Sequence, residues 1–142
     1  MTAIYTTLIN KINTTLSGVT EIAEVFNYQA EEAEITKYPA VIFYPESVEN
    51  SFETNNQNFK IYNFKMYLIV GGKGITKNKL MNTVLAGAVD SILSAFDGAW
   101  NGGTIDGNRV WTIIDTGLWA MREDGNEAYC EFNIKIKLVT NN

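Results

Sequence analysis

Two long segments of the chain alternate between apolar and polar positions, as expected for strands that bury one face. In residues 129–140 the apolar positions are Cys130, Phe132, Ile134, Ile136 and Leu138. In residues 59–70 they are Tyr62, Phe64, Met66, Leu68 and Val70. Because successive side chains of a strand point to opposite faces, each set predicts one face packed on a core.

The second face of residues 59–70 is also partly apolar. Phe59 and Ile61 lie at one end of this face, Tyr67 and Ile69 lie at the other, and polar residues lie between them. Such a face needs a cover, which either a helix of the same chain or a neighbouring subunit can supply. We therefore take Phe59, Ile61 and Tyr67 as candidate self-assembly residues.

Two segments show helical spacing of their apolar residues. Thr2 is positioned to cap a first helix that ends near Gly18, with the apolar stripe Ile4, Tyr5, Leu8, Ile9, Ile12 and Leu16. A second helix is predicted over residues 76–97 and ends at Gly98. Its stripe comprises Leu80, Met81, Val84, Leu85, Ala88, Val89, Ile92, Leu93 and Phe96.

Three further segments have the composition of strands. Residues 40–44, AVIFY, form a continuous apolar run between Pro39 and Pro45, which predicts a central strand buried on both faces. Residues 21–28 predict a strand before it. Residues 110–122 predict a strand with a bulge or bend at Gly117, which then turns into the last strand.

Residues 46–58 are polar and contain several Glu and Asn residues. A connection of this length is uncommon in a compact domain unless it has a function or is disordered, so we interpret it as a long hairpin arm or a mobile loop. Taken together, the elements predict one α+β domain over residues 1–142, with a polar arm at about 46–58. Its sheet is mixed but rich in antiparallel strands, and its two main helices pack on one face.

Phe52 and Trp100 stand in polar segments, and each allows two interpretations. Either the aromatic ring folds back over its own domain, or it is an anchor that is buried in a partner, as exposed aromatic residues often are. In the second case Trp100→Ala would leave the fold intact.

Charge and composition exclude several classes of function. The net charge is −5 without a basic cluster, which argues against tight nucleic-acid binding through phosphates. Residues 1–4 lack the pattern of a signal peptide, and no apolar run approaches the ~20 residues of a membrane span. We therefore expect a globular chain made in the cytoplasm, without a membrane anchor.

The residues that most catalytic and metal sites require are scarce. The chain has no His, which removes Ser-His and Cys-His nucleophile pairs and His-ligated metals. Its one Cys, Cys130, lies on an apolar strand face, where a buried thiol is the ordinary interpretation. Gly71-Gly72-Lys73-Gly74 lacks the spacing of a phosphate loop. We predict that the protein is not an enzyme and needs no cofactor or metal.

The order of elements is that of a known family. The relevant features are the N-terminal helix, the motif Lys37-Tyr38-Pro39-Ala40-Val41 at the second strand, the polar arm, the long strand, the main helix and the final hairpin. In this order the chain resembles the tail terminator, or tail-completion, proteins of long-tailed bacteriophages, which include the lambda-type minor tail protein. The similarity spans nearly the whole chain and rests on architecture.

The resemblance implies a homo-oligomeric ring, commonly of six subunits, in the tail of a virion. Such a ring caps the tail tube, stops its polymerisation and presents a surface to a head-completion or connector protein. DNA would pass through the lumen without sequence-specific binding, and an acidic chain suits that role because it repels DNA. The protein would be made in the cytoplasm of a host bacterium.

Two other interpretations stay open at this point. A head-to-tail connector or stopper protein also forms rings and binds through loops. A non-viral protein-binding module could use the sheet face for a partner and remain monomeric, whereas an enzyme would need a concave pocket with convergent polar groups.

Overall fold

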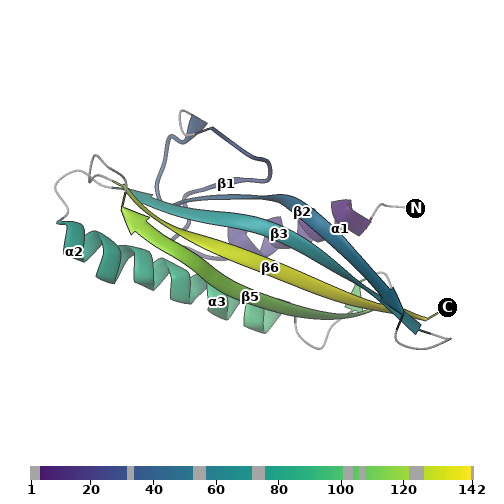
Figure 1. Ribbon diagram of the computed structural model, residues 1–142. Helices are drawn as coiled ribbons and strands as arrows, with labels where there is room; N and C mark the ends of the chain where they lie inside the picture. Colours follow the sequence, from purple (N-terminus) through teal and green to yellow (C-terminus); the bar gives the residue numbers. More distant parts are fainter. Residues whose placement is uncertain are drawn as a thin grey trace.

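A six-stranded sheet with helices on one face makes up the protein (Figure 1). The computed structural model describes residues 4–31, 34–52, 57–71, 76–100, 104–105, 108–121 and 127–141. In spatial order the strands are β1 (Glu24–Phe26), β2 (Ala40–Phe52), β3 (Gln57–Gly71), β6 (Glu127–Asn141), β5 (Asn108–Met121) and β4 (Thr104–Ile105). β1 pairs parallel to β2 and every other pair is antiparallel. The predicted α+β class is confirmed.

The centre of the sheet is the pair β3–β6, which runs in register from Gln57 opposite Asn141 to Gly71 opposite Glu127. These are the two segments whose alternation is clearest in the sequence. β2 extends the sheet on the β3 side as far as Phe52, where it is still paired with Asn58. The polar arm is therefore a hairpin of two paired strands, while its connection, residues 53–56, lies outside the described residues.

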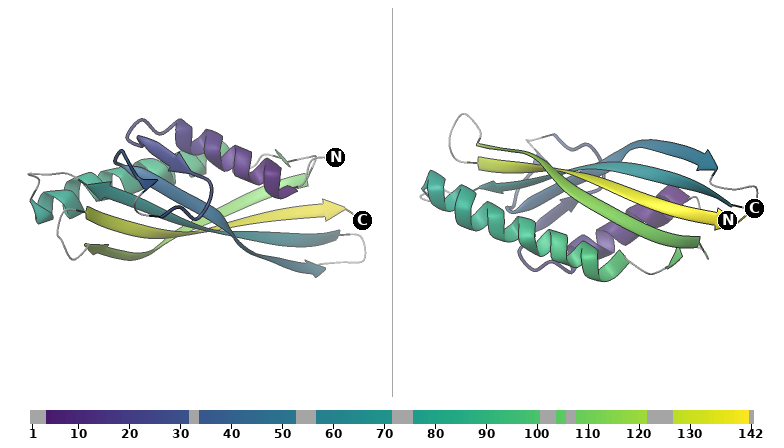
Figure 2. Two further views of the ribbon diagram at one scale, coloured as in Figure 1. Left: turned by 90° about the horizontal axis from the view of Figure 1, so that it is seen from above. Right: turned by 60° about the horizontal axis from the view of Figure 1, so that its bottom comes forward.

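The helices lie together on one face of the sheet (Figure 2). The first, α1 (Ile4–Ser17), packs through Leu8, Ile12 and Leu16 and ends before Gly18, as predicted. Its predicted cap, Thr2, is outside the described residues. The second is a continuous helical segment with three parts: α2 (Lys77–Lys79), the π-helical stretch η2 (Leu80–Leu85) and α3 (Ala86–Trp100).

We call the sheet face beneath the helices the inner face, and it carries the main core. The side chains of Phe132, Ile134 and Ile136 are fully buried there, as are Met66 and Leu68 of the neighbouring strand. Cys130 belongs to the same core, as predicted, and its thiol donates to the Glu131 carbonyl at 3.5 Å. Burial raises the pKa of this thiol to about 11, with a smaller contribution from the Glu131 carboxylate.

Trp100 corrects one prediction and decides between two interpretations. The second helix does not end at Gly98 but continues to Trp100, and this ring is fully buried, so it folds back over its own domain and is not an exposed anchor. It stacks on Phe96 at 5.8 Å between ring centroids, and its indole N–H donates to the Thr15 hydroxyl at 3.0 Å. The Lys11 ammonium lies 5.1 Å from the same ring. Trp100 thus joins α3 to α1 and offers no surface for a partner.

Candidate assembly surface

The sheet face opposite the helices, which we call the outer face, carries the residues that the sequence analysis selected. The strand registers align these residues in rows across the sheet. One row is Glu49, Ile61, Lys137 and Trp111, and the next is Ser47, Asn63, Lys135 and Ile113. A third row is Tyr44, Lys65, Asn133 and Asp115. Along the strands, the outer face divides into a covered end, a polar middle and an open end.

The covered end is closed by the connection between β1 and β2. Ile35 from this connection packs with Ala40, Ile42 and Ile69 in a second small core. Partly buried aromatic and small residues surround it: Phe26, Ala30, Tyr38, Tyr44 and Tyr129. At this end of the sheet the cover is therefore a loop of the same chain and not one of the predicted helices.

Two polar contacts fasten this loop to the sheet. The Tyr38 ring lies against Gly71, where a Cβ atom would be 3.4 Å from it, and the Tyr38 hydroxyl donates to Glu127 at 2.6 Å. The Glu24 carboxylate accepts hydrogen bonds from the Thr36 backbone N–H at 3.1 Å and the Thr36 hydroxyl at 2.8 Å. These bonds lower the pKa of Glu24. The Tyr38-Pro39 motif therefore has a structural role in this chain.

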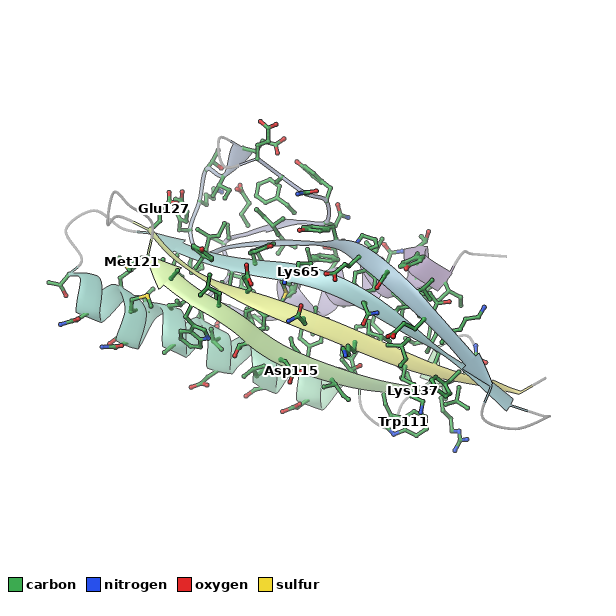
Figure 3. All side chains as sticks on the ribbon, in the orientation of Figure 1. Lys65, Trp111, Asp115, Met121, Glu127 and Lys137 are labelled. Carbon is green, nitrogen blue, oxygen red and sulfur yellow. The ribbon has the colours of Figure 1, made fainter. Side chains whose placement is uncertain are left out.

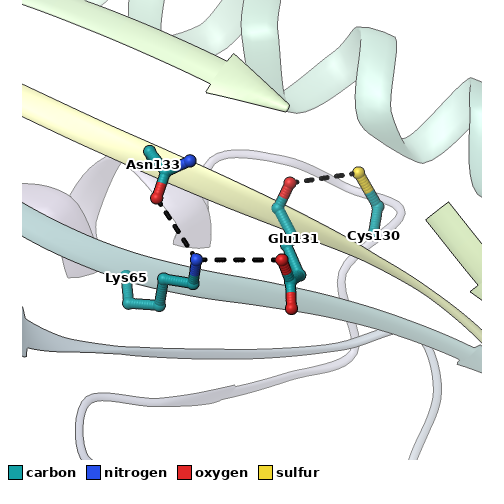
Figure 4. Close-up of polar contacts among 4 residues, drawn as sticks. All are labelled: Lys65, Cys130, Glu131 and Asn133. Atoms are coloured by element: carbon teal, nitrogen blue, oxygen red, sulfur yellow. Dashed lines mark hydrogen bonds and ion pairs between the residues drawn. The ribbon is translucent and has the colours of Figure 1, made fainter. Parts of the chain in front are cut away.

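The polar middle is a network of side chains from β2, β3 and β6. The Lys65 ammonium donates to the Asn133 carbonyl oxygen at 3.3 Å and lies 3.7 Å from a Glu131 carboxylate oxygen (Figure 4). The Asn63 amide donates to the Ser47 hydroxyl at 3.0 Å and to Glu49 at 3.3 Å. A shallow groove runs beside Asn63 toward Lys135. These polar groups separate the covered end from the open end of the outer face.

Large apolar side chains of β5 are exposed along the outer face, by 60% for Ile113 in the row of the polar middle and by 54% for Leu118 beyond Thr116. At the open end, which lies toward the arm, Trp111 is 42% exposed. Trp111 lies near Lys137 at this end, and Lys65 lies in the middle of the same face (Figure 3). Cations lie over the aromatic rings here: the Arg109 guanidinium is 5.5 Å from the Trp111 centroid, and the Lys137 ammonium is 4.2 Å from that of Phe59.

The five candidate residues do not form one cluster. Phe59 and Ile61 lie half-buried at the open end, and Tyr67 lies at the border of the covered end, stacked on Tyr44 at 6.4 Å. Phe52 is the last residue of β2, and its side chain is outside the described part of the structure. Trp100, as shown above, lies in the core.

Sequence reasoning missed Trp111, Ile113 and Leu118, although a signal was present. Val110 and Ile114 alternate with Trp111 and Ile113, so this segment is apolar on both faces in the same way as residues 59–70. Gly117 and Leu118 both lie between the inward residues Thr116 and Trp119, where the register shifts. The predicted bulge at Gly117 is thus confirmed, and a Cβ atom there would be 3.4 Å from the Glu131 carboxylate.

Both long edges of the sheet are only partly paired. β1 covers β2 at Ala40–Ile42 alone, and β4 covers β5 at Asn108 and Arg109 alone. Among the described residues, no strand pairs with the outer side of β2 beyond Ile42 or of β5 beyond Arg109. Unpaired backbone groups at such edges are templates for pairing with another strand.

Comparison with known proteins identifies a shared fold. No protein-family model and no curated protein sequence matches the chain. Among solved structures, it is similar to a chain of the structure described as "Virion of native gene transfer agent (GTA) particle", with a TM-score of 0.55 and 11% sequence identity. The match covers 99% of this chain and 100% of that chain. None of the described helices is long and apolar enough to cross a membrane.

Proposed function

We propose that this protein is a structural component of a virion, and specifically a tail terminator. In this role six copies form a ring that caps the tail tube, ends its polymerisation and joins the tail to a head-completion or connector protein. The ring resides in the virion after synthesis in the cytoplasm of the host bacterium. The proposed role needs neither catalysis nor a cofactor.

The observation that carries this proposal is the end-to-end fold likeness to a chain of a gene transfer agent virion. Because the match covers both chains almost completely, it concerns the whole architecture and not a common substructure. The predicted order of elements, which resembles that of tail terminators, agrees with the observed order from α1 to β6.

The surface of the chain supports the same role. A subunit of a ring must present apolar surface to its neighbours, and β5 exposes Trp111, Ile113 and Leu118. A net charge of −5 would let DNA pass through a lumen without being retained.

The proposal is tested by native mass spectrometry over a wide concentration range, with negative-stain images of the largest species. We expect a closed ring of about six subunits with a central hole. A protein that remains monomeric up to millimolar concentration would contradict the proposal and favour a monomeric binding module.

A second measurement separates a terminator from a connector. The protein is added to growing tubes of the cognate tail tube protein, and tube lengths are measured by electron microscopy. A terminator produces a ring at one tube end and stops elongation there. Tubes that elongate as in the untreated sample would exclude the terminator role even if the protein forms rings.

A further inference from the structure

The free edge of β5 is the most unusual surface that the structure presents. It combines an unpaired strand with three exposed apolar side chains, Trp111, Ile113 and Leu118. Soluble proteins usually protect such an edge with charges, Pro or a covering element, because an exposed apolar edge recruits other strands. We propose that, in the ring of the proposed function on which this inference rests, the β5 edge of one copy pairs with the arm edge of β2 in the next copy.

The direction of the strands is correct for this contact. The order β2, β3, β6, β5 consists of successive antiparallel pairs, so β2 and β5 run in opposite directions. When rotation about a ring axis brings the β5 edge of one copy to the β2 edge of the next, the two strands meet antiparallel. This arrangement is a head-to-tail contact, which is the type that closes a ring.

Local irregularities define which residues can pair. On β2, Pro45 has no N–H and the register shifts between Pro45 and Ser47, so regular pairing is available over residues 48–52. On β5 the bulge beside Gly117 interrupts the edge, which leaves residues 110–116 as the regular stretch. Residues 110–116 of β5 are therefore a long enough stretch to pair with residues 48–52 of β2.

Charge supports β2 of a second copy as the partner. From Ala40 to Phe52 this strand carries Glu46 and Glu49 and no Lys or Arg. On the outer face, the side near β5 carries Arg109, Lys135 and Lys137 toward the arm, whereas its acidic residues, Asp115 and Glu131, lie farther from the arm. A head-to-tail contact brings an acidic edge to a basic one.

A symmetric contact between two β5 edges lacks this complementarity. A two-fold axis would pair the β5 edge with itself, so it would not bring the acidic β2 edge, with Glu46 and Glu49, to the basic one. The arm edge of β2 therefore complements β5 in backbone direction and charge.

The first test compares Ile113→Asp with Tyr28→Asp by native mass spectrometry and circular dichroism. Both replace a large exposed side chain, but Tyr28 lies in the connection between β1 and β2, which covers the other end of the outer face. We expect Ile113→Asp to raise the concentration of half-assembly by at least about tenfold, with an unchanged melting temperature, and Tyr28→Asp to assemble like the parent protein. Equal assembly of Ile113→Asp and the parent protein would overturn the inference.

The second test identifies the partner edge by disulfide trapping. Variants Glu49→Cys and Ile113→Cys are prepared separately, mixed, assembled and oxidised. A second mixture, of Glu49→Cys and Trp111→Cys, tests a strand register that is shifted by two residues. Because the positions in each pair share the outer face and differ in strand, a head-to-tail contact gives a covalent dimer only in a mixture. The native thiol, Cys130, is buried and serves as an internal control.

The outcomes separate this inference from the proposed function. Crosslinked dimers in a mixture support the β2–β5 contact. A dimer from Ile113→Cys alone would show a symmetric β5 contact and overturn it. Closed rings without a crosslink in either mixture would overturn the contact and leave the tail terminator proposal standing, whereas a protein that forms no rings would contradict both.

Discussion

The two faces of the sheet show how one alternating pattern serves two purposes. Ile113 and Ile114 are adjacent on β5, yet Ile114 points inward opposite Ile134 and packs against the core, whereas Ile113 points outward and is 60% exposed. The inner face is a continuous core under α1 and α3. On the outer face, the described residues of the chain form a cover at the end near β1. Apolar residues on a second strand face can therefore indicate either a local cover or a surface for another chain.

The largest expected effect contrasts the two faces through a pair of tryptophans. Trp100→Ala should lower the free energy of unfolding by about 3–5 kcal/mol, because it removes a fully buried ring and its hydrogen bond to Thr15. Trp111→Ala, on the exposed side, should cost about 1 kcal/mol or less. Urea unfolding of both variants at a concentration where the protein is monomeric measures the difference. Similar losses for the two would contradict the division into core and assembly surface.

The next prediction concerns the thiol on the inner face. With a pKa of about 11 in place of ~8.5, Cys130 should react with a thiol reagent at pH 8 at least about 100-fold more slowly in the native protein than in urea. The raised pKa also implies a stabilising contribution that is complete below the unfolded pKa and is lost as the pH rises through about 11. Rapid labelling of the native protein would show that the inner face opens readily.

Ile61→Asp tests the outer face at the open end. This side chain is half-buried between Lys137 and Glu49, so a carboxylate there can remain hydrated in the monomer but not in an interface. We expect a native circular dichroism spectrum and a concentration of half-assembly about tenfold higher than for the parent protein. If the variant is unfolded instead, Ile61 belongs to the internal core.

The smallest effect concerns the covered end. The hydrogen bonds from Thr36 lower the pKa of Glu24 because they favour the ionised carboxylate. The contribution of these bonds to the free energy of unfolding is therefore present above the unfolded pKa of ~4.3 and is lost as the pH falls through the lower folded pKa. Glu24→Gln should therefore lower the melting temperature slightly at pH 7, and the difference from the parent protein should vanish in acid. A difference that is independent of pH would assign the effect to packing.

The helices and strands could be predicted from the sequence wherever the apolar residues follow one period, either that of a strand or that of a helix. The alternation around Phe64 and Phe132 predicts the central strands, and the stripe from Leu80 to Phe96 predicts the main helix. The helix end at Trp100 could not be predicted, because it depends on packing against Phe96 and on a bond to Thr15 on another helix. The local glycine signal at Gly98 favoured an earlier helix end, and tertiary contacts outweighed it.

The candidate surface was predicted only in part, for a related reason. Phe59 and Ile61 stand on a strand whose two faces are easily distinguished, so their position on the outer face could be read from alternation. The exposure of Trp111 and Ile113 depends on β5 lying near the edge of the sheet, which is a property of strand order. The covering loop around Ile35 has no periodic pattern, so its closure of the other end could not be predicted from alternation.

Hydrogen exchange of the β5 amides during assembly tests the central claim, that the free edge of β5 is an assembly surface, most directly. Exchange is measured on the parent protein above and below its concentration of half-assembly, with the paired β3–β6 amides as the internal reference. The account predicts that amides within residues 110–116 become protected in the assembled state, while the β3–β6 amides are protected equally in both states. Unchanged exchange of these β5 amides in an assembled ring would contradict it.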